Sequence, residues 1–134
     1  MSRPEPRAGS QAPPLGVHVF TDDDRIRQAA RSLPAARYVV TYSETAPDAI
    51  DEVRKSKPAV AVLELRVGDY GGFALAKDLR ALPSMADLPL VMLCDRPHDR
   101  WICRQAGARA VIVKPLSDPM ALLDAVETAL APTQ

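Results

Sequence analysis

Side chains able to do chemistry stand directly after four short apolar runs of the sequence. Thr-Asp-Asp-Asp at 21–24 follows the first run, Glu64 and Cys94 end two later runs, and Lys114 follows the last. An acidic cluster of this kind is a candidate metal site, although acids in the first turn of a helix also stabilise its dipole without any ion. A thiol at a strand end is a candidate nucleophile. Which chemistry is available depends on whether the fold brings these residues together.

The elements that must position them follow from hydrophobic periodicity. Short runs rich in β-branched residues predict five strands, at 17–20, 38–42, 59–65, 90–93 and 110–113. Apolar residues at helical spacing predict five helices between and after them, at 23–33, 46–55, 73–82, 99–106 and 118–130. Strict alternation indicates a doubly wound α/β fold, with parallel strands and helices on both faces. Sites in such sheets gather at the carboxyl ends of the strands, where all four groups stand.

Local signals set some of the boundaries. Asp118 followed by Pro119 predicts a helix N-cap, and Gly107 marks the end of the fourth helix. The segment Gly-Asp-Tyr-Gly-Gly at 68–72 predicts a turn, because it lacks the spacing and the lysine of a phosphate-binding loop. We expect a Pro-rich N-terminal tail at 1–14, one domain at 15–131 and a short tail at 132–134.

Composition excludes several classes of protein. Seventeen basic and 17 acidic residues leave no net charge to attract nucleic acid. No apolar run is long enough to span a membrane and the opening residues do not form a secretory signal, so we expect a cytoplasmic protein. The two cysteines, Cys94 and Cys103, have no zinc spacing, and His18 and His98 are interpreted as structural.

Taken in order, TDDD, VLELR, VMLCD and VKP at the strand ends resemble the receiver domains of bacterial response regulators. The resemblance covers about residues 15–131, and segments 58–80 and 107–130 resemble the family's third and fifth strands with the helices that follow them. It implies a flavodoxin-like receiver fold, a five-stranded parallel sheet with strand order 2-1-3-4-5. It also implies a role in two-component signal transduction.

Some residues depart from the family's phosphorylation site. The family's phosphoacceptor is an aspartate, where this chain has Glu64, and the extra methylene should misplace the carboxylate for in-line attack. The family's Mg²⁺-binding acids correspond to Thr21 and Asp22, or after a shift of one residue to Asp22 and Asp23. A hydroxyl in place of a carboxylate weakens such a site. Weak Mg²⁺ binding at Asp22 and Glu64 stays open. No other cofactor is expected. Arg66, shortly after Glu64, is a further residue of this degenerate phosphorylation pocket.

Residues of the fourth and fifth predicted strands also depart from the family's pattern. Cys94 takes the place of the family's Ser or Thr and is only a weak hydrogen-bond donor, and Val111 takes the place of the aromatic switch residue. Lys114 and Pro115 match the family's Lys-Pro pair, whose peptide bond is commonly cis. We hypothesise that Lys114 pairs directly with Glu64; the alternative is that its ammonium only reaches solvent from a buried strand end.

These features predict a non-enzymatic pseudo-receiver that acts through phosphorylation-independent binding of signalling proteins. The resemblance places the contacts on the fourth helix, fifth strand and fifth helix, with Trp101, Arg104 and Arg109 as contact residues; a homodimer stays open.

Two alternatives remain open at this point. One is a Mg²⁺-dependent phosphoacceptor receiver that uses a neighbouring acid, Asp22 or Asp23. The other is a small cysteine-dependent α/β enzyme, for which the sequence places no histidine as a base beside Cys94.

Overall fold

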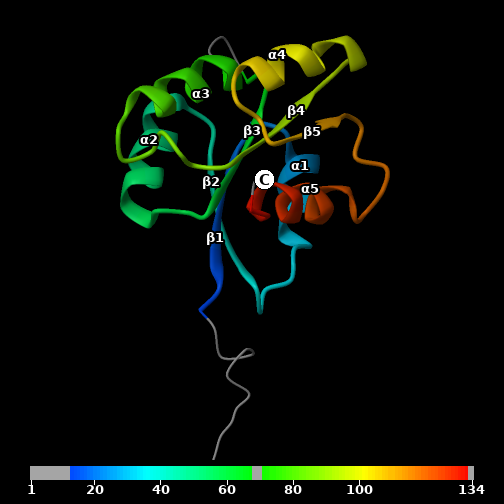
Figure 1. Ribbon diagram of the computed structural model, residues 1–134. Coiled ribbons are helices and arrows are strands. Elements are labelled where there is room, and N and C mark those ends of the chain that lie inside the picture. Colours follow the sequence, from blue (N-terminus) through cyan, green and yellow to red (C-terminus); the bar gives the residue numbers. More distant parts are fainter. Residues whose placement is uncertain (1–12, 68–70, 133–134) are drawn as a thin grey trace, which may run out of the picture.

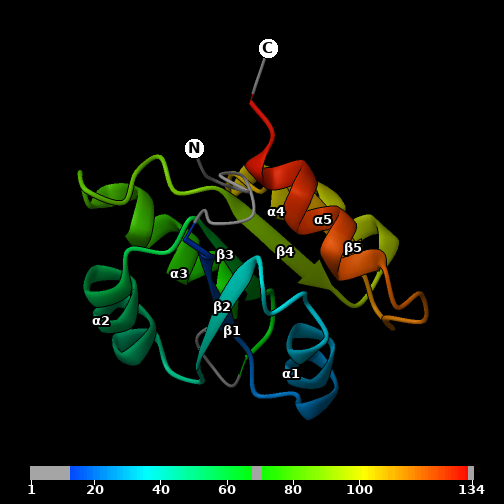
Figure 2. The ribbon, with the colours of Figure 1, turned by 90° about the horizontal axis from the view of Figure 1, so that it is seen from below.

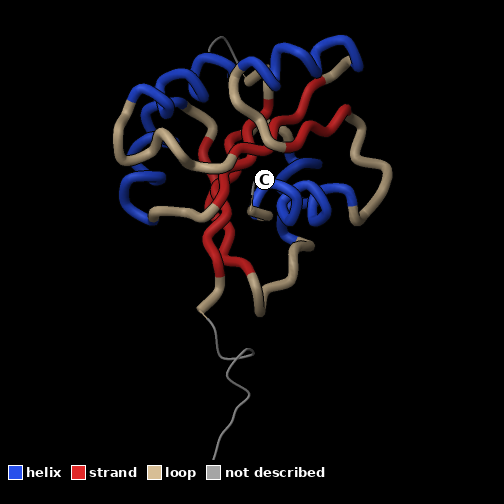
Figure 3. Tube along the Cα trace, in the orientation of Figure 1, coloured by secondary structure: helices blue, strands red, loops and turns tan. Residues whose placement is uncertain are grey.

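A parallel five-stranded sheet forms the centre of the computed structural model, which describes residues 13–67 and 71–132 (Figures 1 and 3). The strands are β1 (Leu15–Phe20), β2 (Tyr38–Ser43), β3 (Val60–Glu64), β4 (Leu90–Cys94) and β5 (Ala110–Val113). The helices are α1 (Asp24–Arg31), α2 (Ala46–Ser56), α3 (Gly71–Ala81), α4 (Arg100–Gln105) and α5 (Ala121–Leu130), with a short 3-10 helix η2 (Pro97–Asp99) before α4. The strand order is β2-β1-β3-β4-β5, which confirms the predicted fold.

The sheet separates two apolar cores. Helices α2, α3 and α4 cover one face, and α1 and α5 cover the other (Figure 1). Seen from below, α5 lies over β4 and β5 (Figure 2). The central strands β3 and β4 are buried along their whole length, so their ends are held rigidly. The predicted tail at 1–14 falls mostly outside the described residues, as do 133–134 of the predicted C-terminal tail.

Two predicted helix starts were wrong. Helix α3 begins at Gly71, so the last two residues of the predicted turn belong to the helix, while 68–70 lie outside the described residues. Gly72 packs so tightly on β3 that a Cβ there would lie 2.4 Å from the carbonyl oxygen of Glu64. Helix α5 begins at Ala121, because Asp118 instead closes a separate turn in which its Oδ1 accepts from the Met120 N–H (2.9 Å).

The predicted end of the fourth helix was correct. Gly107 follows α4 with φ +101°, a left-handed conformation that glycine adopts without strain. A Cβ at this position would meet the end of the Arg80 side chain of α3, which is exposed and can move aside. The backbone turn, rather than packing, is therefore what requires glycine here.

Candidate functional site

Parallel pairing brings the ends of β1, β3, β4 and β5 together at one edge of the sheet. Glu64 is paired in register with Leu93, and Cys94 with Val113. The N–H of Lys114 donates to the Cys94 carbonyl oxygen (2.8 Å), which continues the β4–β5 ladder by one residue. The residues that follow these strands therefore face a common pocket.

Glu64 is the centre of a buried polar network. Only 3% of this residue is exposed. The fully buried Thr21 hydroxyl donates to Glu64 Oε1 (2.6 Å), and the Lys114 ammonium forms a hydrogen-bonded ion pair with Glu64 Oε2. The Asp23 N–H in turn donates to Thr21 Oγ1 (3.0 Å), which orients the hydroxyl toward Glu64. Both oxygens of the Glu64 carboxylate thus have protein partners.

Asp95 is a further member of this network that the sequence analysis missed. Its Oδ1 lies 3.1 Å from Lys114 Nζ, and its Oδ2 lies 4.0 Å from Nε of Arg66. The side chains of Asp95 and Arg66 are about half exposed, so this second contact is a weak one. The sequence feature that could have identified Asp95 was its position directly after β4, at the carboxyl ends of the strands where the other site residues lie.

The charge state of Lys114 follows from these neighbours. Burial lowers the pKa of its ammonium, but the hydrogen bonds and negative charges of Glu64 and Asp95 outweigh burial, and the net pKa is raised. Lys114 therefore stays charged at neutral pH. It holds two carboxylates from different strand ends with one cation, and its own peptide bond to Pro115 is cis.

The acidic cluster does not converge on Glu64. Asp22 is exposed, and Asp23 serves as the N-cap of α1, with its Oδ1 accepting from the Arg25 N–H (2.9 Å). Asp24 pairs with Arg27 in the first turn of α1 (2.9 Å). Thr21 alone of these four residues touches Glu64, as a hydroxyl rather than a carboxylate.

The pocket fits Mg²⁺ poorly. This ion needs several oxygen ligands in octahedral geometry, and usually at least one free carboxylate. Here the oxygens of Glu64 already accept from Thr21 and Lys114, and an ammonium stands between the carboxylates of Glu64 and Asp95. Within residues 13–67 and 71–132, no cluster of three or more His, Cys, Asp or Glu side chains is arranged to hold a metal.

Cys94 lies beside the network without joining it. Its thiol donates to the Arg96 carbonyl oxygen (3.4 Å), and the thiol of Cys103 on α4 is close enough to influence its pKa. Burial raises the pKa of Cys94, and burial together with the neighbouring Cys94 raises that of Cys103 to about 12. Val111, three residues before Lys114, is half-buried and packs against the same core cluster as the two cysteines.

We predict that the two thiols resist alkylation. The thiolate is the nucleophilic form, and raised pKa values with near-complete burial leave little of it accessible at pH 7.5. Iodoacetamide should label the native domain far more slowly than the urea-unfolded domain, as followed by intact mass. Rapid labelling of native protein that is lost in Cys94→Ala but kept in Cys103→Ala would instead support an activated Cys94.

The predicted contact residues are all exposed. Trp101 on α4 is 63% exposed, and Arg104 and Arg109 are exposed as well. Arg109 also makes a contact within the fold, because its Nη1 donates to the Ala129 carbonyl oxygen (3.0 Å) in the last turn of α5. A cation in this position satisfies a terminal carbonyl of the helix.

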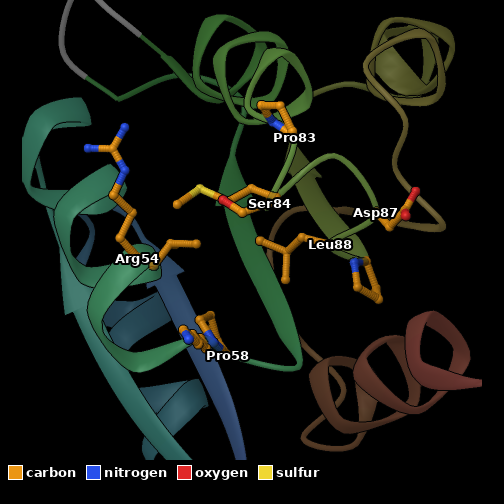
Figure 4. Close-up of a pocket in the computed structure, with 10 residues that line it drawn as sticks. Arg54, Pro58, Pro83, Ser84, Asp87 and Leu88 are labelled. Carbon is orange, nitrogen blue, oxygen red and sulfur yellow. The ribbon is translucent and has the colours of Figure 1, made fainter.

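Two of the cavities among the described residues lie at opposite ends of the strands. One, of about 410 Å³, opens beside the network and is lined by Asp23, Asp95, Lys114 and Pro115 together with residues of α1. The other, of about 450 Å³, lies where β3 and β4 begin and is walled by α2 and the α3–β4 connection (Figure 4). Arg54 and Asp87 stand on opposite sides of it, and prolines such as Pro58 and Pro83 line it (Figure 4). It is remote from the strand ends that carry the polar network.

These features define an α/β domain of the flavodoxin-like class with its site at the carboxyl ends of β1, β3, β4 and β5. The model of the response regulator receiver domain family matches residues 17–127, most of the 134-residue chain. The chain belongs to this family. It is a receiver domain of a response regulator in two-component signalling, and receiver domains interact with signalling partners.

Solved structures agree on the fold. The chemotaxis protein CheY4 of Vibrio cholerae is 24% identical with a TM-score of 0.78, over 88% of this chain and 100% of that one. A candidate response regulator of Chloroflexus aurantiacus is 24% identical with a TM-score of 0.79, over 90% of this chain and 100% of that one. A CheY-like receiver domain protein of Methanospirillum hungatei is 20% identical with a TM-score of 0.75, over 88% and 94%. No curated protein matches the chain in sequence.

None of the helices within the described ranges has the length and apolar character needed to cross a bilayer.

Proposed function

We propose that this receiver domain works without phosphorylation of its acceptor position and acts by binding signalling proteins. The observation that carries the proposal is the buried network in which Thr21 and Lys114 occupy the two oxygens of Glu64. A carboxylate that attacks phosphorus needs a free oxygen aligned with the donor. Glu64 is held away from this role by its partners, and the lysine that would contact an incoming phosphoryl group is neutralised by two carboxylates.

The same network argues against a functional Mg²⁺ site. Binding the ion would require Lys114 to leave Glu64 or Asp95, and Thr21 contributes no charge to replace that loss. Asp22, which the alternative mechanism would use as acceptor or metal ligand, is exposed, and it is Thr21 that hydrogen-bonds Glu64. We therefore propose that the pocket is a fixed structural pair and that the domain carries out no phosphotransfer.

The proposed output surface includes α4, β5 and α5. Trp101, Arg104 and Arg109 are its exposed contact residues, and Arg109 in addition holds the last turn of α5. Cys94 supports the absence of a phosphate-driven switch, because its thiol already donates to Arg96 and is a weak donor to any oxyanion. A homodimer through this surface remains one form that the interaction could take.

The test combines NMR with mass spectrometry. We expect the amide spectrum of the domain to stay unchanged on addition of Mg²⁺ and then of beryllofluoride, a phosphoryl mimic, and its intact mass to stay unchanged with acetyl phosphate. Saturable shifts at Glu64, Cys94 and Lys114 that spread to α4 and β5 would restore a working phosphate switch. If phosphoryl transfer occurs, its persistence in Glu64→Gln would assign the acceptor to another acid, and its loss would assign it to Glu64.

A further inference from the structure

An apolar groove runs between the start of α3 and α4, beside the polar network. It measures about 460 Å³ and is lined by Leu65, Arg66, Phe73, Trp101, Ile102 and Gln105. Leu65 is buried and Ile102 half-buried, so they form its floor, whereas Phe73 (36% exposed) and Trp101 (63% exposed) form its walls. Both helices lie along the same side of the sheet (Figure 1).

The exposure of two aromatic side chains in one groove is unusual within this fold. The other large exposed hydrophobic residues among those described, Leu15, Val39 and Met120, do not line it. Scattered apolar residues need no explanation, but paired aromatics over an apolar floor form the kind of anchor site at which partners bind. Trp101 and Phe73 are thus placed to bury an apolar side chain between them.

The charge around the groove determines whether an acidic or a basic partner segment can bind there. Arg66 is the one charged residue among the described residues that line it. Lys77 lies over the Phe73 ring, with its Nζ 5.5 Å from the centroid. Helix α4, with the sequence RWICRQ, adds the exposed Arg100 and Arg104 and has no acid. Among the described residues, these cationic side chains outnumber the acid beside them, Asp95, so this part of the rim favours carboxylates and disfavours a basic segment.

We propose that this groove docks a short, acidic amphipathic helix of a partner protein. Apolar side chains at helical spacing would pack against Phe73 and Trp101, as in other helix-in-groove complexes, while flanking carboxylates pair with Arg66 and Arg104. The proposal names the partner of the interaction module described above and rests on that function. It uses the α3 side of α4, a surface distinct from β5 and α5.

The groove is also linked to the pocket. Arg66 Nε lies 4.0 Å from Asp95 Oδ2, and Asp95 Oδ1 lies 3.1 Å from Lys114 Nζ, which pairs with Glu64. A partner carboxylate that takes over Arg66 would compete with Asp95 for it. Docking should therefore change the environment of Asp95 and Lys114, as expected for a domain whose conformation is set by its partner.

The test uses a defined probe, an acetylated helical peptide with Leu and Phe at i, i+3, i+4 and i+7 and Glu at the other positions. Trp101 is the only tryptophan in the domain and the peptide contains none, so fluorescence reports on the groove directly. We expect a saturable change in Trp101 emission and amide shifts confined to the groove, Asp95 and Lys114. The same peptide with Lys in place of Glu should produce neither.

Variants locate the contact, with amide shifts as the readout. Trp101→Ala should weaken binding about tenfold or more, as expected for an aromatic anchor. Arg66→Gln should weaken binding and abolish the shift at Lys114. Met120→Ala, which removes an equally accessible apolar side chain (51% exposed) outside the groove, should bind like the unaltered domain. Equal binding by Trp101→Ala and Met120→Ala would overturn the proposal.

A second arm separates this inference from the proposed function. The titration is repeated after incubation with Mg²⁺ and acetyl phosphate. Equal binding in both arms supports docking without phosphorylation. Absence of groove shifts in both arms, with unchanged mass, overturns the docking proposal and leaves the interaction module intact. Binding only after a gain in mass overturns phosphorylation independence. Tighter binding of the Lys peptide than of the Glu peptide would overturn the proposal that the partner helix is acidic.

Discussion

Replacing Lys114 by Met is expected to lower the free energy of unfolding by about 3 kcal/mol at neutral pH, since removing one partner of a buried ion pair leaves an uncompensated charge. The methionine keeps the apolar stem and removes only the ammonium. Glu64, with 3% of its surface exposed, would then keep the hydrogen bond from the Thr21 hydroxyl but lose the ammonium. The loss is therefore electrostatic, and urea unfolding followed by circular dichroism measures it.

A double variant distinguishes this explanation from general damage to the pocket. Lys114→Met combined with Glu64→Gln removes both charges of the ion pair, so we expect most of the lost stability to return. Lys55→Met changes an exposed lysine of α2 and should alter stability by less than about 0.5 kcal/mol. If the single and double Lys114 variants are equally unstable, the ion pair does not account for the effect.

The second large effect is a loss of stability in mild acid that originates at His18. This residue is fully buried on β1, with its ring nitrogens hydrogen-bonded to Thr41 Oγ1 (2.8 Å) and Ser43 Oγ (2.7 Å). Burial lowers the pKa of His18 from 6.5 to about 4, despite an opposing influence from the charge of Glu52. The folded domain therefore keeps a neutral imidazole at pH values where the unfolded chain binds a proton.

The sign of the pH dependence follows directly. Between pH 6.5 and about 4 the unfolded state binds more protons at this residue, so stability is complete above pH 6.5 and falls as the pH drops. A shift of this size corresponds to about 3 kcal/mol at the acid end of the window. Urea unfolding at pH 7 and pH 4.5 should show the decline. It should become much shallower in His18→Gln and remain in His98→Gln, since the side chain of His98 is 68% exposed.

The fold could be predicted because its signals are local and repeated. Each strand has a β-branched run and each helix an apolar stripe, and alternation then leaves a parallel sheet as the consistent arrangement. Helix starts were less predictable. Asp118 has the right side chain for an N-cap, but it closes a turn with Met120 instead, and α5 begins three residues later. Short polar side chains stabilise either arrangement equally well, so sequence does not distinguish them.

The site was predictable to the same extent as the strands that carry it. Thr21 and Lys114 directly follow β1 and β5, and Glu64 ends β3, so the register in which the strands pair brings the three residues together. Asp95 is different, because its carboxylate reaches Lys114 through the path of the β4–α4 connection. The hydrogen bond from the Arg109 side chain to the Ala129 carbonyl oxygen likewise depends on where α5 ends, and no local sequence pattern predicts it. Contacts between irregular segments are decided by tertiary structure.

The arrangement of the two cores has a consequence for synthesis of the chain. One face of the sheet is covered by α1 together with Leu122, Ala125, Val126 and Ala129 of α5, the last helix of the domain to be synthesised. Translation at about 5–20 residues per second separates β1 from α5 by roughly 5–20 seconds. During this interval a valine-rich strand surface lacks its cover, so the nascent chain is open to chaperones and to aggregation. The domain can complete its folding only after α5 has emerged.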